Sequence, residues 1–358
     1  MSSYTGIDWH KQYSVCYSVN EQGSRLGEGR INGNDLADFQ AYFARLPGPH
    51  AVVHEACWNW AKLHELLEQV PDITRLVLSH PYKTRLIAEA QIKTDRLDAK
   101  ALATLLRGNL IAAVHVPGRA LRQRKHVLRE RLQRAQLRTM VRNRIHHTVD
   151  RQHDLPLPQC RDLFGRQGLA ALKDAKLPDE ERQILDDELA LHTLLQTQIH
   201  ATEQRIAADH EQQPTVQRLQ SMPGVGKILG AVIAAEIDTV TRFISADKLC
   251  AYAGLVPTTH ASGGKIRHGK LLPFCNKHLR WAFVEAAWVA VGCSPYFGAY
   301  YHRQRARGKP ANTAIMITAR RMCRIVWSML KEECDFCPAV PAQNQRPRSL
   351  AITTEGHR

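Results

Sequence analysis

Two acidic residues, Asp95 and Asp98, stand three positions apart at the start of a segment rich in Ala and Leu, 99–106. Such a segment is predicted to be a helix, and residues three positions apart lie on one face of a helix. Two carboxylates on one face repel each other unless a divalent cation or a basic side chain lies between them. Acidic residues are also favoured by the dipole in the first turn of an ordinary solvated helix. The pair therefore predicts either a metal site or a plain helix start.

Two further acids upstream favour the metal site. Residues 4–31 alternate apolar and polar side chains between turns, which predicts three antiparallel strands with Asp8 at the end of the first. Glu55 follows the apolar stretch 51–54, a predicted buried strand, and strands and helices then alternate up to Asp95. This order predicts an α/β sheet of the ribonuclease-H-like layout, with acids on strand one, at the end of strand four and on a late helix. The other elements predicted here are a helix capped by Asn34 and running through Leu46, a strand over 76–78 and a helix over 86–88.

The four acids Asp8, Glu55, Asp95 and Asp98 offer the hard oxygen ligands that suit Mg²⁺ or Mn²⁺. Two such ions can stabilise both the attacking and the leaving oxygen of a phosphodiester displacement. The sequence thus predicts phosphoryl-transfer chemistry, on condition that these four side chains converge in the fold.

The stretch 119–147 is strongly basic, with ten Lys and Arg against one acid, Glu130. Its apolar residues recur at helical spacing, so a long helix is predicted. Four of its arginines step along one side of that helix: Arg131, Arg134, Arg138 and Arg142. The one-sided charge favours a face that follows nucleic-acid phosphates, and the alternative is the solvated face of a helical hairpin.

A second long helix is predicted over 180–210, with mixed charges. Its expected apolar stripe consists of Ile184, Leu191, Leu195, Ile199 and Ile206. Two long helices around an irregular link indicate an antiparallel arm or a dimerising coiled coil.

Residues 219–236 place the tight turn 223–226 between two predicted helices, a pattern typical of a helix-hairpin-helix. The glycines Gly224 and Gly226 let backbone N–H groups approach a phosphate, and the second helix points its N-terminus and Lys227 at the same anion. A plain packing turn is the alternative. The segment is not a phosphate-binding Walker loop, because Ile228 stands where Ser or Thr is needed.

Ser262 stands in a glycine-flanked basic loop with Lys265, Arg267 and Lys270. An exposed hydroxyl beside cations that hold a phosphate is a candidate nucleophile, although a Ser-Gly-Gly run is also a common linker. Helices are predicted after this loop, around 277–288 and 311–332, and the Pro-containing tail is predicted to be disordered.

The net charge of +15 indicates a polyanionic partner. Nucleic acid is favoured over a membrane surface, because no basic amphipathic segment carries an aromatic face. The length of 358 residues predicts two or three domains. Neither a signal peptide nor an apolar membrane span is expected, and nine scattered cysteines favour reduced thiols in the cytoplasm. One CxxC, Cys334 with Cys337, lacks the second pair that a structural zinc site needs.

Taken together, these motifs resemble those of the DEDD insertion-sequence transposases, whose recombination is guided by a bridge RNA. The resemblance spans roughly residues 4–330. It is carried by the runs Gly6-Ile7-Asp8-Trp9-His10-Lys11, Glu55, Lys93-Thr94-Asp95-Arg96-Leu97-Asp98-Ala99, Pro223-Gly224-Val225-Gly226, and Gly254-Leu255-Val256-Pro257 followed by Ser262-Gly263-Gly264-Lys265.

The resemblance implies a RuvC-like domain over 1–116, in which Asp8, Glu55, Asp95 and Asp98 hold Mg²⁺ or Mn²⁺. It implies a helical coiled-coil arm over 117–213 and a mostly α transposase domain over 214–333, with the disordered tail at 334–358. Ser262 would join covalently to a DNA phosphate. Donor and target DNA, a structured bridge RNA, and a homodimer or homotetramer with composite sites are the implied partners, in the cytoplasm at the bacterial nucleoid.

Two places depart from the family pattern. Cys57, Trp58 and Trp60 stand where a small polar residue, Gly and an aromatic residue are usual. Pro273-Phe274-Cys275 replaces a basic residue and Gly before Asn276. Two alternative functions stay open: a metal-dependent junction endonuclease that uses water without a covalent step, and a non-catalytic nucleic-acid-binding protein.

Overall fold

The computed structural model describes residues 2–85, 87, 94–151, 162–210, 213–262 and 264–338. The chain divides into two compact units, Met1–Pro117 and Gly118–Arg358. Within the described residues, we find no helix with the length and hydropathy that crossing a membrane requires.

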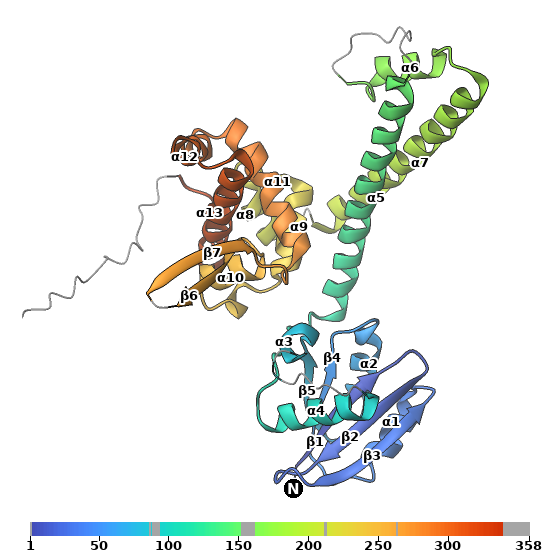
Figure 1. The fold of residues 1–358 in the computed structure, drawn as a ribbon, viewed down its shortest axis with the longest axis vertical. Helices are drawn as coiled ribbons and strands as arrows, with labels where there is room; N and C mark the ends of the chain where they lie inside the picture. Colours follow the sequence, from blue (N-terminus) through green and yellow to red (C-terminus); the bar gives the residue numbers. More distant parts are fainter. Residues whose placement is uncertain are drawn as a thin grey trace, which may run out of the picture. The chain divides into compact units, whose positions relative to one another are not determined.

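A five-stranded mixed sheet forms the centre of the first unit (Figure 1). Its strands are β1 (Ser3–Trp9), β2 (Tyr13–Val19), β3 (Arg25–Asn32), β4 (His50–Glu55) and β5 (Ile73–Ser79), in the order β3-β2-β1-β4-β5. The first three strands are antiparallel, and β4 and β5 run parallel to β1. The predicted meander and α/β order are therefore confirmed, and the arrangement is consistent with a ribonuclease-H-like sheet.

Helices cover both faces of this sheet. In the described part of this unit, the helices are α1 (Leu36–Phe43), α2 (Trp60–Leu67), α3 (Pro81–Arg85) and α4 (Asp95–Arg107). One face buries Ile7 and Trp9 in a core that includes Phe39 and Leu63 from α1 and α2. The other face packs against α4, which approaches so closely that a Cβ on Gly6 would lie 2.1 Å from the carbonyl oxygen of Ala99. Only glycine fits there.

The predicted cap of the first helix was wrong by one residue. Asp35 is the N-cap of α1, because its side chain accepts a hydrogen bond from the backbone N–H of Asp38. Asn34 has a positive φ of 55° and is buried. Its amide instead accepts a bond from Ser14 and donates one to the carbonyl of His10. Of the helix predicted over 86–88, Leu86 and Ala88 lie outside the described residues, as does Lys93.

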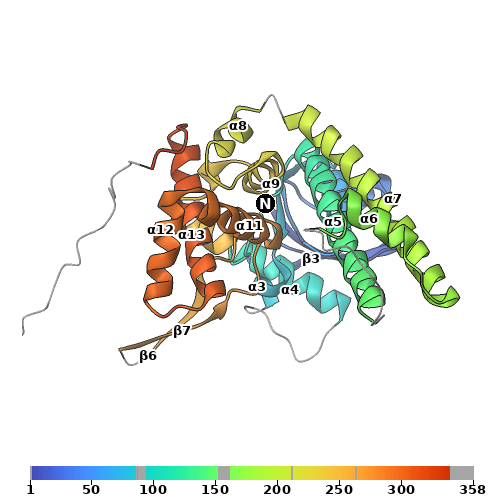
Figure 2. The ribbon, with the colours of Figure 1, turned by 90° about the horizontal axis from the view of Figure 1, so that it is seen from above.

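In the second unit, the helices α5 (Arg119–Asp150) and α7 (Asp179–His210) pack side by side as an antiparallel pair (Figure 2), with α6 (Arg166–Asp174) between them in the chain. The predicted apolar stripe of α7 was partly wrong, since Ile184 and Leu191 are exposed. The buried stripe keeps the predicted Leu195, Ile199 and Ile206, but Leu185 and Leu189 take the places of Ile184 and Leu191.

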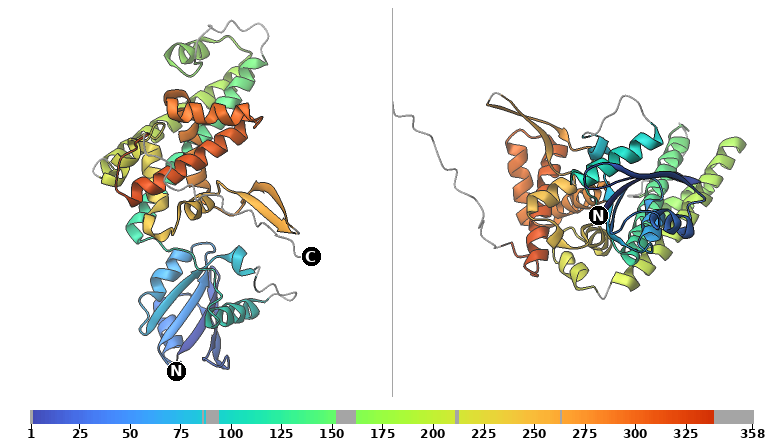
Figure 3. Two further views of the ribbon diagram at one scale, coloured as in Figure 1. Left: turned by 90° about the vertical axis from the view of Figure 1, so that its left-hand side faces the viewer. Right: turned by 90° about the horizontal axis from the view of Figure 1, so that it is seen from below.

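The rest of the second unit is mostly helical and shares one apolar core. Its helices are α8 (Pro214–Gln220), α9 (Lys227–Ile237), the short 3₁₀ helix η1 (Val240–Arg242), α10 (Ala246–Tyr252), α11 (Lys277–Cys293), α12 (Pro295–Ala306) and α13 (Ala311–Lys331). The segment around Ser262 is a β-hairpin rather than a loop, formed by β6 (Pro257–Ser262) and β7 (Lys265–Leu271), and it projects from these helices (Figure 3).

The ordered chain continues beyond the predicted boundary at residue 333. The backbone N–H of Cys334 donates to the carbonyl of Met329, and that of Phe336 donates to the Ser221 hydroxyl. The Phe336 ring also stacks on Phe297, with 5.6 Å between ring centroids. The disorder predicted for residues 339–358 concerns a segment outside the described residues.

Candidate functional site

The sheet directs Asp8 and Glu55 toward the same side. Side chains alternate between the two faces of a strand, and Gly6, two residues before Asp8, meets α4. On β4, Val53 packs against Leu102 of α4, and Glu55 is again two residues further on. Because Ile7 pairs with His54 in parallel register, Asp8 and Glu55 follow at the same level of the sheet.

The first turn of α4 adds the remaining two acids on that side. Thr94 caps the helix by accepting a hydrogen bond from the N–H of Leu97 at 3.2 Å, which fixes where the helix begins. Asp95 and Asp98 therefore both fall in the first turn. The Oδ2 of Asp95 accepts a 2.9 Å hydrogen bond from the Tyr13 hydroxyl.

A histidine completes the cluster. The Nε2 atom of His10 lies 3.1 Å from Oδ2 of Asp8 and 3.3 Å from Oδ2 of Asp95. Oxygens of these two acids and a ring nitrogen of His10 all lie within 4.8 Å of one another. Asp98 and Glu55 stand outside this group of three, and each has interactions of its own.

The electrostatics show how closely the acids are gathered. Burial raises the pKa of Asp8, His10 lowers it, and the negative charges of Asp95 and Asp98 raise it further, so that the net shift is upward. The Cys57 thiol has a raised pKa, first because of burial and also because Glu55 and Asp8 act on it. Both acids thus reach the same thiol, and the four carboxylates share one end of the sheet.

The residues of this cluster fit a divalent cation. Carboxylate oxygens with one imidazole nitrogen are a ligand set that Mg²⁺ or Mn²⁺ can take. The Nε2 atom of His10 faces a carboxylate oxygen of each of the acids Asp8 and Asp95. Sequence reasoning placed the four acids but assigned no role to His10 or Tyr13. The signal for His10 was its position two residues after Asp8, just beyond the end of β1.

Ser262 is exposed and is the last residue of β6, where it pairs with Lys265 across the hairpin turn. Gly264 in that turn has a φ of 75°, which favours glycine. Arg267 and Lys270 on β7 are exposed, while the side chain of Lys265 lies outside what the structure describes. The hairpin therefore presents a serine hydroxyl and cations to solvent.

A buried ionic cluster fixes the base of this hairpin. Glu236 of α9 is 2% exposed and accepts two hydrogen bonds from Arg129 of α5, at 2.9 and 3.0 Å. Lys125 lies 3.5 Å from the same carboxylate, and Asn276 donates to it at 2.8 Å. Asn276 follows the hairpin and bonds twice to Tyr252, which precedes it.

Burial alone would raise the pKa of Glu236, but Lys125, Arg129 and Asn276 outweigh it and lower the pKa overall. The carboxylate is therefore ionised and paired. Sequence analysis missed this cluster. The available signal was a single acid in the apolar stretch 227–237.

The arginine row of α5 turns toward α7. Arg131 bonds Glu203, Arg134 donates to Thr202 at 2.9 Å, Arg138 to Gln196 at 2.7 Å, and Arg142 to His192 at 3.1 Å. All four side chains are partly buried in the seam between the helices. These contacts give the row a role in joining α5 to α7, and the phosphate-binding role that the charge pattern favoured stays a prediction.

In the turn 223–226, one glycine packs against a neighbouring helix and the other is open to solvent. Gly224 has a φ of 84°, and a Cβ there would lie 2.2 Å from the carbonyl oxygen of Ala286, so it packs against α11. Gly226 caps α9, and a Cβ at this position would meet no other atom within 4 Å. A hollow of about 600 Å³ lies over this turn and reaches Val289. The helix start is accessible to a ligand.

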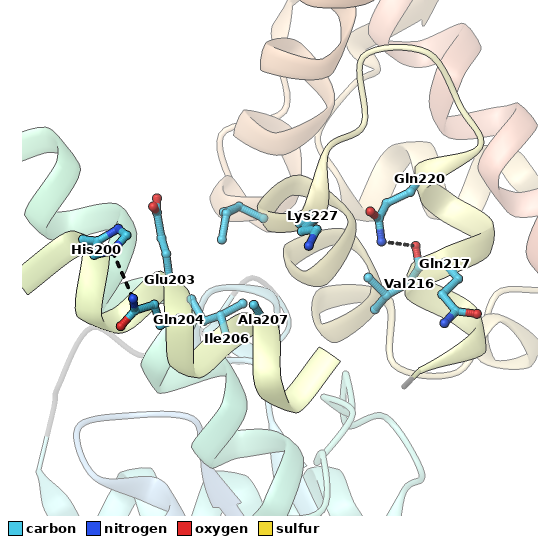
Figure 4. A pocket seen from close by; sticks show the side chains of 10 residues that line it. His200, Glu203, Gln204, Ile206, Ala207, Val216, Gln217, Gln220 and Lys227 are labelled. Carbon is cyan, nitrogen blue, oxygen red and sulfur yellow. Dashed lines mark hydrogen bonds between the residues drawn. The ribbon is translucent and has the colours of Figure 1, made fainter. Parts of the chain in front are cut away.

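A second cavity, of about 650 Å³, lies between α7 and the α8–α9 pair and is shown in Figure 4. Its α7 wall carries His200, Glu203 and Gln204, and Lys227 stands on the α9 side. Ile206 and Val216 contribute apolar surface. Among the described residues that line it, Glu203 is the only acid.

The first unit combines a mixed α/β sheet with an acidic cluster at one end, and comparisons with known proteins name the family. Residues 5–153 match a transposase family model, the DEDD transposases of IS110 type, and residues 216–302 match the model described as the transposase IS116/IS110/IS902 family. The chain belongs to this family of insertion-sequence transposases.

Individual proteins that resemble this chain are consistent with this family. A 43.6 kDa protein of insertion element IS110 from Streptomyces coelicolor is 36% identical over 42% of this chain and 37% of its own length. A probable family 20 transposase from Pseudomonas aeruginosa is 24% identical over 94% of this chain and 99% of its length. A pilin gene-inverting protein from Moraxella bovis is 31% identical over 33% of this chain and 37% of its length. The alignment with the first of these relatives spans little more than a third of that protein.

Proposed function

We propose that this protein is a DNA recombinase of an insertion sequence, which cuts DNA and rejoins it. The observation that carries the proposal is the convergence of Asp8, His10 and Asp95, with Asp98 acting on Asp8, at one end of the sheet. Carboxylates collected in this way are costly to a fold unless a cation offsets their repulsion. Family membership supplies the substrate class, DNA.

In this proposal Asp8, Glu55, Asp95 and Asp98 hold Mg²⁺ or Mn²⁺, which would neutralise charge that develops on the reacting phosphate. Ser262 is the nucleophile. Its Oγ bonds to the phosphorus of a phosphodiester, the bond from phosphorus to one sugar oxygen breaks, and the serine proton passes to that leaving oxygen. A hydroxyl of the new DNA end then attacks the phosphoserine, so that the strand is rejoined without ATP. The exposure of Ser262 at a hairpin turn supports this role.

The nucleophile is tested with Ser262→Ala. The variant is expected to form no covalent DNA–protein adduct, whereas the unaltered protein forms one that survives denaturing electrophoresis. Ser245→Ala, a change of the same type at the N-cap of α10, is the matched control and keeps the adduct. Full cleavage by Ser262→Ala would favour the junction endonuclease, in which water replaces the serine.

The proposed partners are donor and target DNA, a structured guide RNA and further copies of the chain, at the bacterial nucleoid in the cytoplasm. The surplus of positive charge, +15, supports polyanionic partners. The RNA rests on the family resemblance, and it would select DNA by base pairing while the protein contacts backbone and shape.

The arm helices support the oligomer. Large apolar side chains are exposed on α5 and on α7, among them Met140 at 60% and Leu194 at 53%. On α7, Ile184, Leu191 and Leu194 follow the seven- and three-residue spacing of a coiled-coil seam, on a stripe separate from the one that packs against α5. We expect a second copy to cover this stripe.

Leu191→Glu is therefore expected to shift the protein from dimer or tetramer toward monomer, because a charge cannot be buried unpaired in such a seam. Light scattering after size-exclusion chromatography measures the mass. Gln183→Glu, at an exposed polar position of the same helix, should leave the mass unchanged. An unaltered mass for Leu191→Glu would show that the stripe is not the contact.

A further inference from the structure

One surface of the second unit carries an exposed tryptophan beside a half-buried tyrosine, and the proposed site uses neither ring. Trp288 on α11 is 45% exposed, and its ring centroid lies 6.4 Å from that of Tyr301 on α12. The ring of His302 meets Tyr301 at 5.3 Å. An exposed tryptophan grouped with other rings is unusual on a surface and marks an interaction site.

Positive charge continues directly from these rings. Arg305 lies one helical turn after Tyr301, on the same face of α12. Three further exposed cations stand near the C-terminal end of this helix: Arg303 within it, and Arg307 and Lys309 just after it. The stretch 286–331 contains no Asp or Glu. Glu285, one turn before Trp288, is the acid that comes before this stretch.

Several other cations of the second unit are paired with acids. Lys125 and Arg129 face Glu236, Arg131 faces Glu203, and Arg324 faces Asp247. Within the described residues, no ion pair engages the four cations of the α12 end, and Arg305 donates a hydrogen bond to the backbone carbonyl of Lys309. Their charge is therefore available to an external anion.

The patch also adjoins the turn before α9. Val289, the neighbour of Trp288, is 55% exposed and lines the hollow over the turn 223–226. The open N-terminus of α9 at Gly226 is suited to a phosphate. Rings for bases and cations for phosphates thus adjoin on one surface of α9, α11 and α12.

We infer that this patch binds an unpaired segment of a DNA strand, with bases stacked on Trp288 and Tyr301 and the backbone held by Arg305 and Lys309. A duplex hides the faces of its bases, whereas unpaired bases can stack on aromatic rings without sequence preference. The uncompensated cations match phosphates, and four cations beside the rings would repel a basic protein surface. The inference rests on the proposed function for its choice of DNA.

The test measures binding of labelled oligo-dT by fluorescence anisotropy, in EDTA and on a Ser262→Ala background, so that neither cleavage nor the nucleophile enters the result. Trp288→Ala is expected to weaken oligo-dT binding about 10- to 100-fold and to leave duplex DNA binding unchanged. Trp288→Phe should restore most of the loss, because it keeps a ring. Equal loss for duplex and single strand, or no loss at all, would overturn the inference.

The cations are tested by salt dependence. The double change Arg305→Gln with Lys309→Gln should lower the slope of log affinity against log salt for oligo-dT by about 1.4, since each lost phosphate contact on a single strand contributes about 0.7. The matched control is Arg320→Gln with Arg324→Gln, two arginines of α13 that face Asp247, and it should lower the slope less. A slope unaltered by the first pair, or a Trp288→Ala effect confined to oligo-U RNA, contradicts the proposal.

Discussion

Replacing Asp8 by Asn is expected to lower DNA cleavage and joining about 1,000-fold. Asn keeps the size of the side chain and an oxygen that can face His10, but it removes the charge that a divalent cation needs. A loss of about 4 kcal/mol of charge stabilisation at the reacting phosphate corresponds to that factor. The rate of strand cleavage in Mg²⁺ or Mn²⁺ measures it.

Although Asp8→Asn lowers activity, it is expected to raise the stability of the metal-free protein. Burial raises the pKa of Asp8, so the ionised carboxylate costs stability at neutral pH when no cation offsets it. Asp8→Asn removes that cost and is expected to raise the melting temperature in EDTA. It should also abolish the further rise that Mn²⁺ gives the unaltered protein by binding the folded state.

This pair of melting curves separates a metal site from a merely damaged fold. Asp38→Asn, an exposed acid of α1 in the same unit, is the matched control and should keep both the activity and the Mn²⁺ effect. Retention of the Mn²⁺ effect by Asp8→Asn would refute the assignment of Asp8 as a ligand. Unchanged activity in both variants would favour the non-catalytic binding protein.

The sheet and its acids were predictable because strand periodicity and the spacing of Asp95 and Asp98 are local features of the sequence. Asp8 and Glu55 end two strands that the register brings together, and alternation alone fixes the side they face. His10 escaped prediction although Asp8 is only two positions away, because its second partner, Asp95, is 85 positions away and comes close only in the fold. Pairing across such a separation depends on how α4 docks on the sheet.

The helices α5 and α7 show what residue spacing cannot predict, namely which side of a helix faces its neighbour. Arg131 and Arg138 do step along one side of α5, as predicted, but charge patterning could not say which side. Their partners are mixed polar groups of α7, Glu203 and Gln196. Similarly, Ile184 and Leu185 are neighbours in α7, and only packing against α5 decides which of the two is buried.

The second large effect is expected at Glu236. Glu236→Gln leaves Lys125 and Arg129 without their counter-charge, and Lys125 is itself buried. Removal of one partner from a buried ion pair costs about 3–5 kcal/mol, which lowers the melting temperature of a unit of this size by roughly 10 °C. Calorimetry of the full chain measures the transition of the second unit. Glu203→Gln, which faces Arg131 in the partly exposed arm seam, is the matched control and should cost about 1 kcal/mol or less.

The pH dependence gives a sharper test of the same cluster. The folded pKa of Glu236 lies below its ordinary value, so its contribution to stability is present above the unfolded pKa, about 4.3, and is lost as the pH falls through the folded pKa. The difference in melting temperature between the unaltered protein and Glu236→Gln should therefore be largest near neutral pH and shrink in acid. A difference that stays constant through this range would mean that the carboxylate is not held ionised by Lys125 and Arg129. Because Asn276 bonds both Glu236 and Tyr252, the variant is also expected to loosen the base of the Ser262 hairpin and to slow adduct formation at temperatures where the unit stays folded.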